Sequence, residues 1–214
     1  MPRPSPGRGG ASYARSVDPI TAVITGLGLA GSAGLNAYVP LLVVGLLGRT
    51  GVLHLTSPYD GLTSTPVLVV LGLLFAVEFL ADKVPGIDSV NDLIQTFVRP
   101  VAGAVLFAGS IGVGTSLPPW VGVVAGLVTA GGVHVTKAAA RPAITVSTGG
   151  VGGPVVSLVE DATALVASLL AVLAPLLLVA VAVVAALLLR RWWRTWRSRR
   201  TSTLDPARGS AADG

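Results

Sequence analysis

Charged side chains interrupt the apolar stretches of this sequence, and they are the residues that could do chemistry. Glu78 lies four positions before Asp82, so the two carboxylates share one face of a helix. They repel each other unless a proton or cation binds, or unless Lys83 or Arg99 neutralises them. Burying an acid between apolar residues in a membrane costs on the order of 2–3 kcal/mol, and such an acid normally faces a partner or a cavity. The alternative is a solvated loop at the membrane surface.

Two more carboxylates, Asp88 and Asp92, follow in the same block. Carboxylate oxygens are the ligands that divalent cations prefer. The acids are irregularly spaced, so the sequence leaves the question of a metal site open.

A second group of charges lies in the C-terminal half of the chain. His134, Lys137 and Arg141 follow i, i+3, i+7 spacing and therefore form one stripe of a helix. Glu160 and Asp161 interrupt the next apolar run. A cation of the stripe could pair with one of these acids across adjacent helices, which is a structural role. The functional interpretation is a charged cavity shared with the acid of the earlier block.

Two glycine-rich stretches surround these charges. In the first, small residues at 26, 28, 31 and 34 precede Asn36. They either let helices pack closely or mark a broken helix whose freed backbone groups line a polar cavity together with Asn36. The second stretch, residues 147–154, is too rich in glycine for a regular helix. Two such stretches in opposite halves are typical of transporters built from structural repeats.

The composition places these residues in a membrane protein. Of 214 residues, 52% are hydrophobic and 12% are charged, whereas a soluble domain carries about 25% charged residues. The excess positive charge lies in the two tails, which fits an anionic membrane surface better than a nucleic-acid groove. With no cysteine, two histidines and no nucleophile placed beside a base, we expect neither an enzyme nor a cofactor.

The apolar runs define the domain organisation. Residues 1–19 are predicted to be a disordered basic tail, residues 20–189 a transmembrane domain, and residues 190–214 an interfacial anchor of Arg and Trp followed by a disordered tail. The runs within the domain are 20–48, 66–81, 100–116, 120–140 and 155–189. Leu117-Pro118-Pro119 forces a tight helical hairpin, and Pro175 interrupts the last run. We therefore predict an all-α, polytopic transmembrane bundle of about five or six hydrophobic segments, some interrupted or re-entrant.

Positive charge predicts the orientation of such a bundle. Five single crossings divide Lys and Arg almost evenly. With both tails inside and one more crossing after Arg141, fourteen lie inside and one outside. The glycine-rich stretch 145–154 could supply that crossing. A re-entrant hairpin at residues 20–48 gives eleven to four. We expect a multi-pass protein of a bacterial cell membrane with both termini in the cytoplasm.

Several of these stretches together resemble a bacterial family of small membrane proteins, the domain of unknown function DUF4126. The resemblance covers about residues 20–175. It rests on residues 30–38, on Glu78…Ala81-Asp82-Lys83-Val84-Pro85-Gly86-Ile87-Asp88 with Arg99-Pro100-Val101-Ala102-Gly103, and on His134…Lys137…Arg141 with Ser157…Glu160-Asp161. The resemblance implies membrane location and shared polar positions, and no activity.

Two functions fit these observations. In the first, the protein is a small transporter or channel, and the charges line its pathway with Asn36. In the second, it is a membrane scaffold or assembly factor whose charges are structural ion pairs. The expected partners are the lipid bilayer, with anionic lipid at the Arg/Trp segment, and no nucleic acid; a homo-oligomer is compatible with either function.

Overall fold

The structure, a computed structural model, is helical throughout its regular elements. It describes residues 18–81, 87–113, 115–149 and 152–202; the side chains at 87–90, 92, 145 and 195–202 lie outside this description. Within these residues there are seven α-helices and one short 3₁₀ helix. They are α1 (Pro19–Leu35), α2 (Tyr38–Arg49), η1 (Tyr59–Thr63), α3 (Thr65–Ala81), α4 (Ile87–Gly112), α5 (Pro119–Ser147), α6 (Gly152–Leu173) and α7 (Pro175–Ser202).

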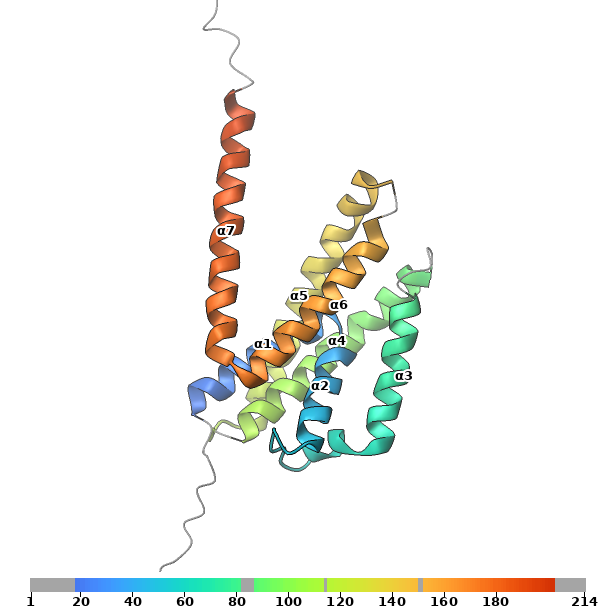
Figure 1. The fold of residues 1–214 in the computed structure, drawn as a ribbon, viewed down its shortest axis with the longest axis vertical. Helices are drawn as coiled ribbons and strands as arrows, with labels where there is room; N and C mark the ends of the chain where they lie inside the picture. Colours follow the sequence, from blue (N-terminus) through green and yellow to red (C-terminus); the bar gives the residue numbers. More distant parts are fainter. Residues whose placement is uncertain (1–17, 82–86, 114, 150–151, 203–214) are drawn as a thin grey trace, which may run out of the picture. The chain divides into compact units, whose positions relative to one another are not determined.

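Two compact units make up the chain, residues 1–175 and 176–214. Helices α1–α6 belong to the first unit, and α7 forms the described part of the second (Figure 1). The predicted domain boundary after residue 189 falls inside α7. Of the predicted tail segments 1–19 and 190–214, residues 1–17 and 203–214 lie outside the described residues, while Pro19 belongs to α1 and residues 190–202 belong to α7.

Helix ends follow local sequence signals. Asp18 accepts a hydrogen bond from Thr21 N at 3.2 Å, and Pro19 is the first helical residue of α1. Proline suits this position because the first amides of a helix have no intrahelical acceptor. Pro175 begins α7 in the same way, since α6 ends at Leu173. The long apolar run 155–189 is therefore two helices.

Two helices extend beyond their predicted apolar segments. The sequence predicted segments 100–116 and 120–140, whereas α4 begins at Ile87 and α5 continues to Ser147. Pro100 and Pro142 consequently lie inside helices. Each removes one backbone hydrogen bond, a loss that neighbouring groups can compensate in a membrane bundle. The predicted tight hairpin between these segments is confirmed, because α4 and α5 pack against each other along their length.

Glycines allow that close packing. A Cβ on Gly122 would lie 2.7 Å from Ala108 Cα, and one on Gly126 would lie 2.6 Å from Ala104 Cα. A Cβ on Gly103 would likewise lie 2.8 Å from the carbonyl oxygen of Gly126. No side chain fits at these distances, so α4 and α5 meet backbone to backbone, as small residues permit in lipid.

Helices α1 and α2 form a hairpin that enters the bundle and returns to the same end. Midway along α1, Gly26 lies against the ring of Phe107, close to the C-terminal end of α4. Beyond α2, which packs on η1, the ring of Tyr59 lies against Gly109 at that same end of α4. Figure 1 shows α2 turning back from the interior. The turn between them lies at Asn36, inside the bundle, where α1 packs against α4, α5 and α6.

Helix α3 and the first half of α4 are apolar outside and polar inside. On α3 only Leu71 and Glu78 are buried among the described residues, while its other large apolar side chains are partly or fully exposed. In the first half of α4, Gln95 and Arg99 are buried and Phe97 is exposed. This inverse of a water-soluble pattern is expected for helices that face lipid.

Four described helical stretches are long and apolar enough to cross a membrane, and α1, α2 and α3 are shorter apolar helices. The four are Leu93–Gly112, Pro119–Ile144, Gly152–Leu173 and Pro175–Arg194. The predicted all-α membrane fold is thus confirmed.

Candidate functional site

The break between α1 and α2 is organised by Asn36. Its Oδ1 accepts hydrogen bonds from the amides of Tyr38 at 3.0 Å and Val39 at 3.1 Å, the first amides of α2. Its Nδ2 donates to Asp161 Oδ1 at 2.8 Å. The break also frees the carbonyl of Leu35, which accepts a hydrogen bond from a lysine described below. One side chain therefore starts α2 and holds an acid of α6.

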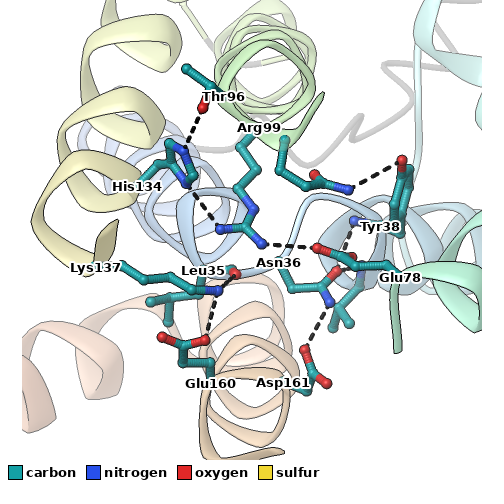
Figure 2. A network of polar contacts seen from close by, with 12 residues as sticks. Leu35, Asn36, Tyr38, Glu78, Thr96, Arg99, His134, Lys137, Glu160 and Asp161 are labelled. Carbon is teal, nitrogen blue, oxygen red and sulfur yellow. Dashed lines mark hydrogen bonds and ion pairs between the residues drawn. The ribbon is translucent and has the colours of Figure 1, made fainter. Parts of the chain in front are cut away.

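A fully buried ion pair joins α3 to α4. Arg99 Nη2 lies 2.9 Å from Glu78 Oε1, and the two side chains are 0% and 2% exposed. The other end of the guanidinium donates to His134 Nδ1 of α5 at 2.9 Å. His134 Nε2 in turn lies 3.1 Å from Thr96 Oγ1. Figure 2 shows this row of contacts, which links three helices through one arginine.

A second ion pair joins α5 to α6. Lys137 Nζ lies 2.6 Å from Glu160 Oε2 and donates to the freed carbonyl of Leu35 at 3.0 Å (Figure 2). Arg141 Nη2 lies 3.5 Å from the same oxygen of Glu160. The three charged side chains are 5%, 13% and 21% exposed in the order Lys137, Glu160, Arg141. This pair is thus less completely enclosed than the first.

An open groove leads to the second pair. It has a volume of about 570 Å³, and Lys137 and Glu160 are its charged residues. Its remaining lining is apolar or small: Leu35, Thr129, Gly132, Val133, Thr136 and Ala140. The groove arises because α5 and α6 both pack on α1 but touch each other little. The Lys137–Glu160 pair is therefore reachable from the outer surface of the bundle.

We call this group of side chains the polar cluster. It holds three cations and three anions and consists of Asn36, Glu78, Thr96, Arg99, His134, Lys137, Arg141, Glu160 and Asp161. Its charges balance when His134 is neutral. The polar cluster contains carboxylate, imidazole and amine groups, the types of group that bind ions or exchange protons. The imidazole contacts Arg99 and Thr96, and the amine contacts Glu160.

Most predicted site residues meet in the polar cluster. The structure brings together Asn36, Glu78, Arg99, His134, Lys137, Arg141, Glu160 and Asp161. Of the predicted partners for Lys137, the structure selects Glu160, because Asp161 is held by Asn36. Four other predicted residues are not placed: Asp82 and Lys83, and the side chains of Asp88 and Asp92, lie outside the described residues.

Some residues that make polar contacts in the structure were not among the predicted site residues. Thr96 binds His134, and Gln95 Nε2 lies 3.5 Å from Tyr38 Oη. The spacing offers one signal for Gln95: it precedes Arg99 by four residues and thus shares its face of α4. The carbonyl of Leu35 carried no signal, since a backbone acceptor becomes available only where a helix breaks.

Both interpretations of the first glycine stretch hold in part. Gly26 packs on Phe107, and a Cβ on Gly34 would lie 2.6 Å from the carbonyl oxygen of Ala130. The helix breaks at Asn36 all the same. The second stretch is only partly irregular, because α5 includes Ser147 and α6 begins at Gly152, with Gly149 in a left-handed turn at φ +61°.

Among the described residues, no three His, Asp or Glu side chains converge as a metal site would require. Neither a curated protein nor a solved structure matches the chain. The domain of unknown function DUF4126 matches residues 23–195, which include every described member of the polar cluster. This helical, membrane-type chain therefore belongs to the DUF4126 family.

Proposed function

We propose that this protein is a small transporter or channel-like protein and that the polar cluster forms part of its pathway. The observation that carries the proposal is the helix break at Asn36. Inside the bundle it places the carbonyl of Leu35, which accepts from Lys137, and the first amides of α2, which donate to Asn36, beside charges from α3, α4, α5 and α6. Broken helices that meet at a midplane site are how many transporters bind polar substrates without water.

The depth of the cluster supports this function. Arg99 lies 12 residues after the start of α4 and 13 residues before its end, which places it roughly 18–20 Å from either end at 1.5 Å per residue. A cluster that served only the membrane surface would lie at the ends of helices. Glu160 and Asp161 likewise lie near the middle of α6, whereas Glu78 lies close to the end of α3 and Arg141 close to the end of α5. Charges within membrane helices are costly to bury and are functional candidates by default. We propose no catalytic step.

A scaffold or assembly factor is the second candidate, and the balance of charges favours it. Each cation of the polar cluster lies within 4 Å of an acid: Arg99 of Glu78, and Lys137 and Arg141 of Glu160. Paired charges of this kind also fasten helices together. The two functions predict different results when an acid is neutralised: a transporter should show a changed flux, whereas a scaffold should show no flux with or without the change.

Flux through reconstituted vesicles tests the proposal. Purified protein in liposomes that contain a pH-sensitive or a Na⁺- or K⁺-sensitive dye should dissipate an imposed gradient of at least one of these cations faster than protein-free liposomes. Glu160→Gln, beside the open groove, should change that rate while the protein stays folded. Asp60→Asn, an exposed acid on η1, is the matched control and should leave the rate unchanged. Rates equal to protein-free liposomes, with loss of folded protein in Glu160→Gln, would establish the scaffold instead.

The helix order also supports a topology. Because α1 and α2 return to one end, the N-terminus and the α2–α3 connection share a side of the membrane, and α3–α6 provide four alternating crossings. A fifth crossing by α7 would place the seven arginines of residues 190–214 with Lys83, Arg99, Lys137 and Arg141, eleven cations against four. If α7 did not cross, both termini would share a side, again eleven against four.

The apolar length of α7 supports the topology in which α7 crosses the membrane. Pro175–Arg194 is long and apolar enough to span the bilayer. We therefore propose a cytoplasmic C-terminus and an external N-terminus, in place of the two cytoplasmic termini that the sequence count favours. Cysteines at Ser5 and Ser210 test this in intact cells. We expect an impermeant thiol reagent to label position 5 alone, whereas protection of both positions would support the sequence-based expectation.

We further propose that the end of α7 binds anionic lipid. Arg190, Arg191 and Arg194 flank Trp192 and Trp193, and all five side chains are exposed. Tryptophan prefers the headgroup level of a bilayer, and each cation near an anionic leaflet contributes about 1 kcal/mol. The same segment would then hold the C-terminus at the cytoplasmic leaflet.

A further inference from the structure

The hydrogen bonds of His134 fix its protonation state. Arginine has five N–H donors and no acceptor, and it keeps its proton in proteins. Arg99 Nη1 lies 2.9 Å from His134 Nδ1, so Nδ1 must accept this hydrogen bond and carry no proton. The proton of the neutral ring is therefore on Nε2, where it is donated to Thr96 Oγ1 at 3.1 Å. His134 is thus a neutral imidazole of defined tautomer.

A second proton on His134 is incompatible with this contact. An N–H at Nδ1 would point at an N–H of Arg99, and two positive charges would lie 2.9 Å apart. His134 is 3% exposed, so bulk water cannot screen them. The ring can bind a proton only if the guanidinium moves.

The described cations and anions around His134 balance when the ring is neutral. Among the described side chains, the charged or titratable groups of the helices around His134 are Tyr38 on α2, Glu78 on α3, Arg99 on α4, Lys137 and Arg141 on α5, and Glu160 and Asp161 on α6. The side chains of Asp88 and Asp92 on α4 lie outside this description. Glu160 binds Lys137 and Arg141, and Asp161 binds Asn36. Of the described acids, Glu78 is the one that Arg99 holds and that a displaced guanidinium or a protonated His134 would share.

A displaced guanidinium has an acceptor on its own helix. Gln95 lies one turn before Arg99 on the same face of α4, and both side chains are buried. Within the described part of the chain, Gln95 Oε1 and Arg99 Nε are buried without a hydrogen-bond partner. A shift of Arg99 toward Gln95 could satisfy both atoms and vacate the position in front of Nδ1.

We propose that His134 is the proton-binding site of the polar cluster and that proton binding displaces Arg99 from the ring. The one bond that forms is an N–H bond, made by the incoming proton and the lone pair of Nδ1, which now accepts a hydrogen bond from Arg99; no bond between heavy atoms changes. Since Arg99 also holds Glu78, this event alters the joint between α3 and α4. The proposal rests on the proposed function only in one consequence, that the proton is then the coupling ion of the transporter.

Nitrogen NMR tests the tautomer directly. The chain has two histidines, and the second, His54, is exposed. Protein carrying His54→Asn and ¹⁵N-labelled histidine therefore reports on His134 alone. At pH 8 we expect a protonated Nε2 and an unprotonated Nδ1, and on acidification the signal of a doubly protonated ring. The Nδ1–H tautomer, a charged ring at pH 8, or a ring that never titrates would overturn the proposal.

Stability against pH gives a second, independent readout. Unfolded histidine titrates near pH 6.5. Because the folded chain must give up the Arg99 contact to bind the proton, unfolding takes up a proton below this pH, and stability falls as pH falls. Between pH 8 and 5.5 we expect the melting temperature of the wild-type protein to fall by on the order of 5 °C.

His134→Asn should remove most of this fall, because the Asn amide oxygen can accept from Arg99 and cannot be protonated. His54→Asn, the matched control, should retain it. Equal pH profiles for His134→Asn and the wild-type protein would contradict the proposal. These measurements need no flux, so a titrating His134 in a protein without transport would fail the proposed function alone. Flux with a non-titrating ring would fail this inference alone.

Discussion

The two ion pairs of the bundle contain the same kinds of group in different surroundings. Glu78 and Arg99 are 2% and 0% exposed and join α3 to α4. Lys137 and Glu160 are 5% and 13% exposed, border the open groove, and have Arg141 as a third member. The first pair is sealed, whereas the second can exchange with its surroundings.

The difference in exposure suggests that one pair stabilises the helix bundle and that the other is accessible to a ligand. Removing one partner of a sealed pair leaves a charge that water cannot reach, which is the costly case. Removing a partner beside the groove leaves a charge with a second cation and partial solvation. The sealed pair also holds a helix with little other attachment, because α3 buries only Leu71 and Glu78 among its described residues. We therefore expect stability to depend on the first pair and ligand access on the second.

The largest effect is expected at the sealed pair. Arg99→Met removes the cation that lies 2.9 Å from the buried Glu78 and should destabilise the protein by about 3–5 kcal/mol. Adding Glu78→Gln should recover much of this loss because no charge is then stranded. Thermal unfolding in detergent measures both. If Arg99→Met costs no more than the exposed control Arg49→Gln, the pair is not sealed and the comparison fails.

A smaller loss of stability is expected when the ion pair beside the groove is broken. Lys137→Met should cost about 1–3 kcal/mol, the usual penalty for an unsatisfied buried group, since Glu160 keeps its contact with Arg141 at 3.5 Å. Glu160→Gln should rescue this variant in a double-mutant cycle. Neither Asp161→Asn nor Glu78→Gln should do so, because those acids have other partners. Rescue by Glu78→Gln would instead show that the two ion pairs are energetically coupled and form one site.

A third test uses the break that lies between the pairs. Asn36→Asp keeps an oxygen for the first amides of α2, since Asp and Asn cap helices about equally well. It also places a second carboxylate where Nδ2 now lies 2.8 Å from Asp161. We expect a loss of about 1–2 kcal/mol at neutral pH from like-charge repulsion and the lost hydrogen bond.

The control for that repulsion is the double variant with Asp161→Asn, which should restore most of the stability. It should also show a weaker pH dependence between pH 7 and 5 than Asn36→Asp alone. An unchanged loss in the double variant would mean that Asn36 serves α2 and not Asp161.

The smallest effect is expected at the rim of the second pair. Arg141 is 21% exposed and lies 3.5 Å from Glu160. Pairs of this exposure contribute about 0–1 kcal/mol, so Arg141→Gln should shift the melting temperature by no more than a few degrees. A loss as large as that of Lys137→Met would show that Arg141, and not Lys137, neutralises Glu160.

The sequence was sufficient for the class of fold and for most of the cluster's members. Apolar runs of membrane-spanning length and a low share of charge specify helices in lipid, because no water satisfies the backbone there. The cost of a charge in such a run also singles out Glu78, Lys137 and Glu160 without any structure. The i, i+3, i+7 stripe of α5 placed His134 and Lys137 on one face correctly, since this spacing is a property of a single helix.

Only the tertiary structure decided which of these residues meet. The choice of Glu160 over Asp161 for Lys137 depends on how α5 and α6 are rotated about their axes, and neighbouring residues of one helix point about 100° apart. The role of Leu35 depends on where a helix breaks, and that of Arg99 depends on how α3, α4 and α5 pack against one another. Local spacing fixes the face on which a residue lies; packing fixes what that face meets.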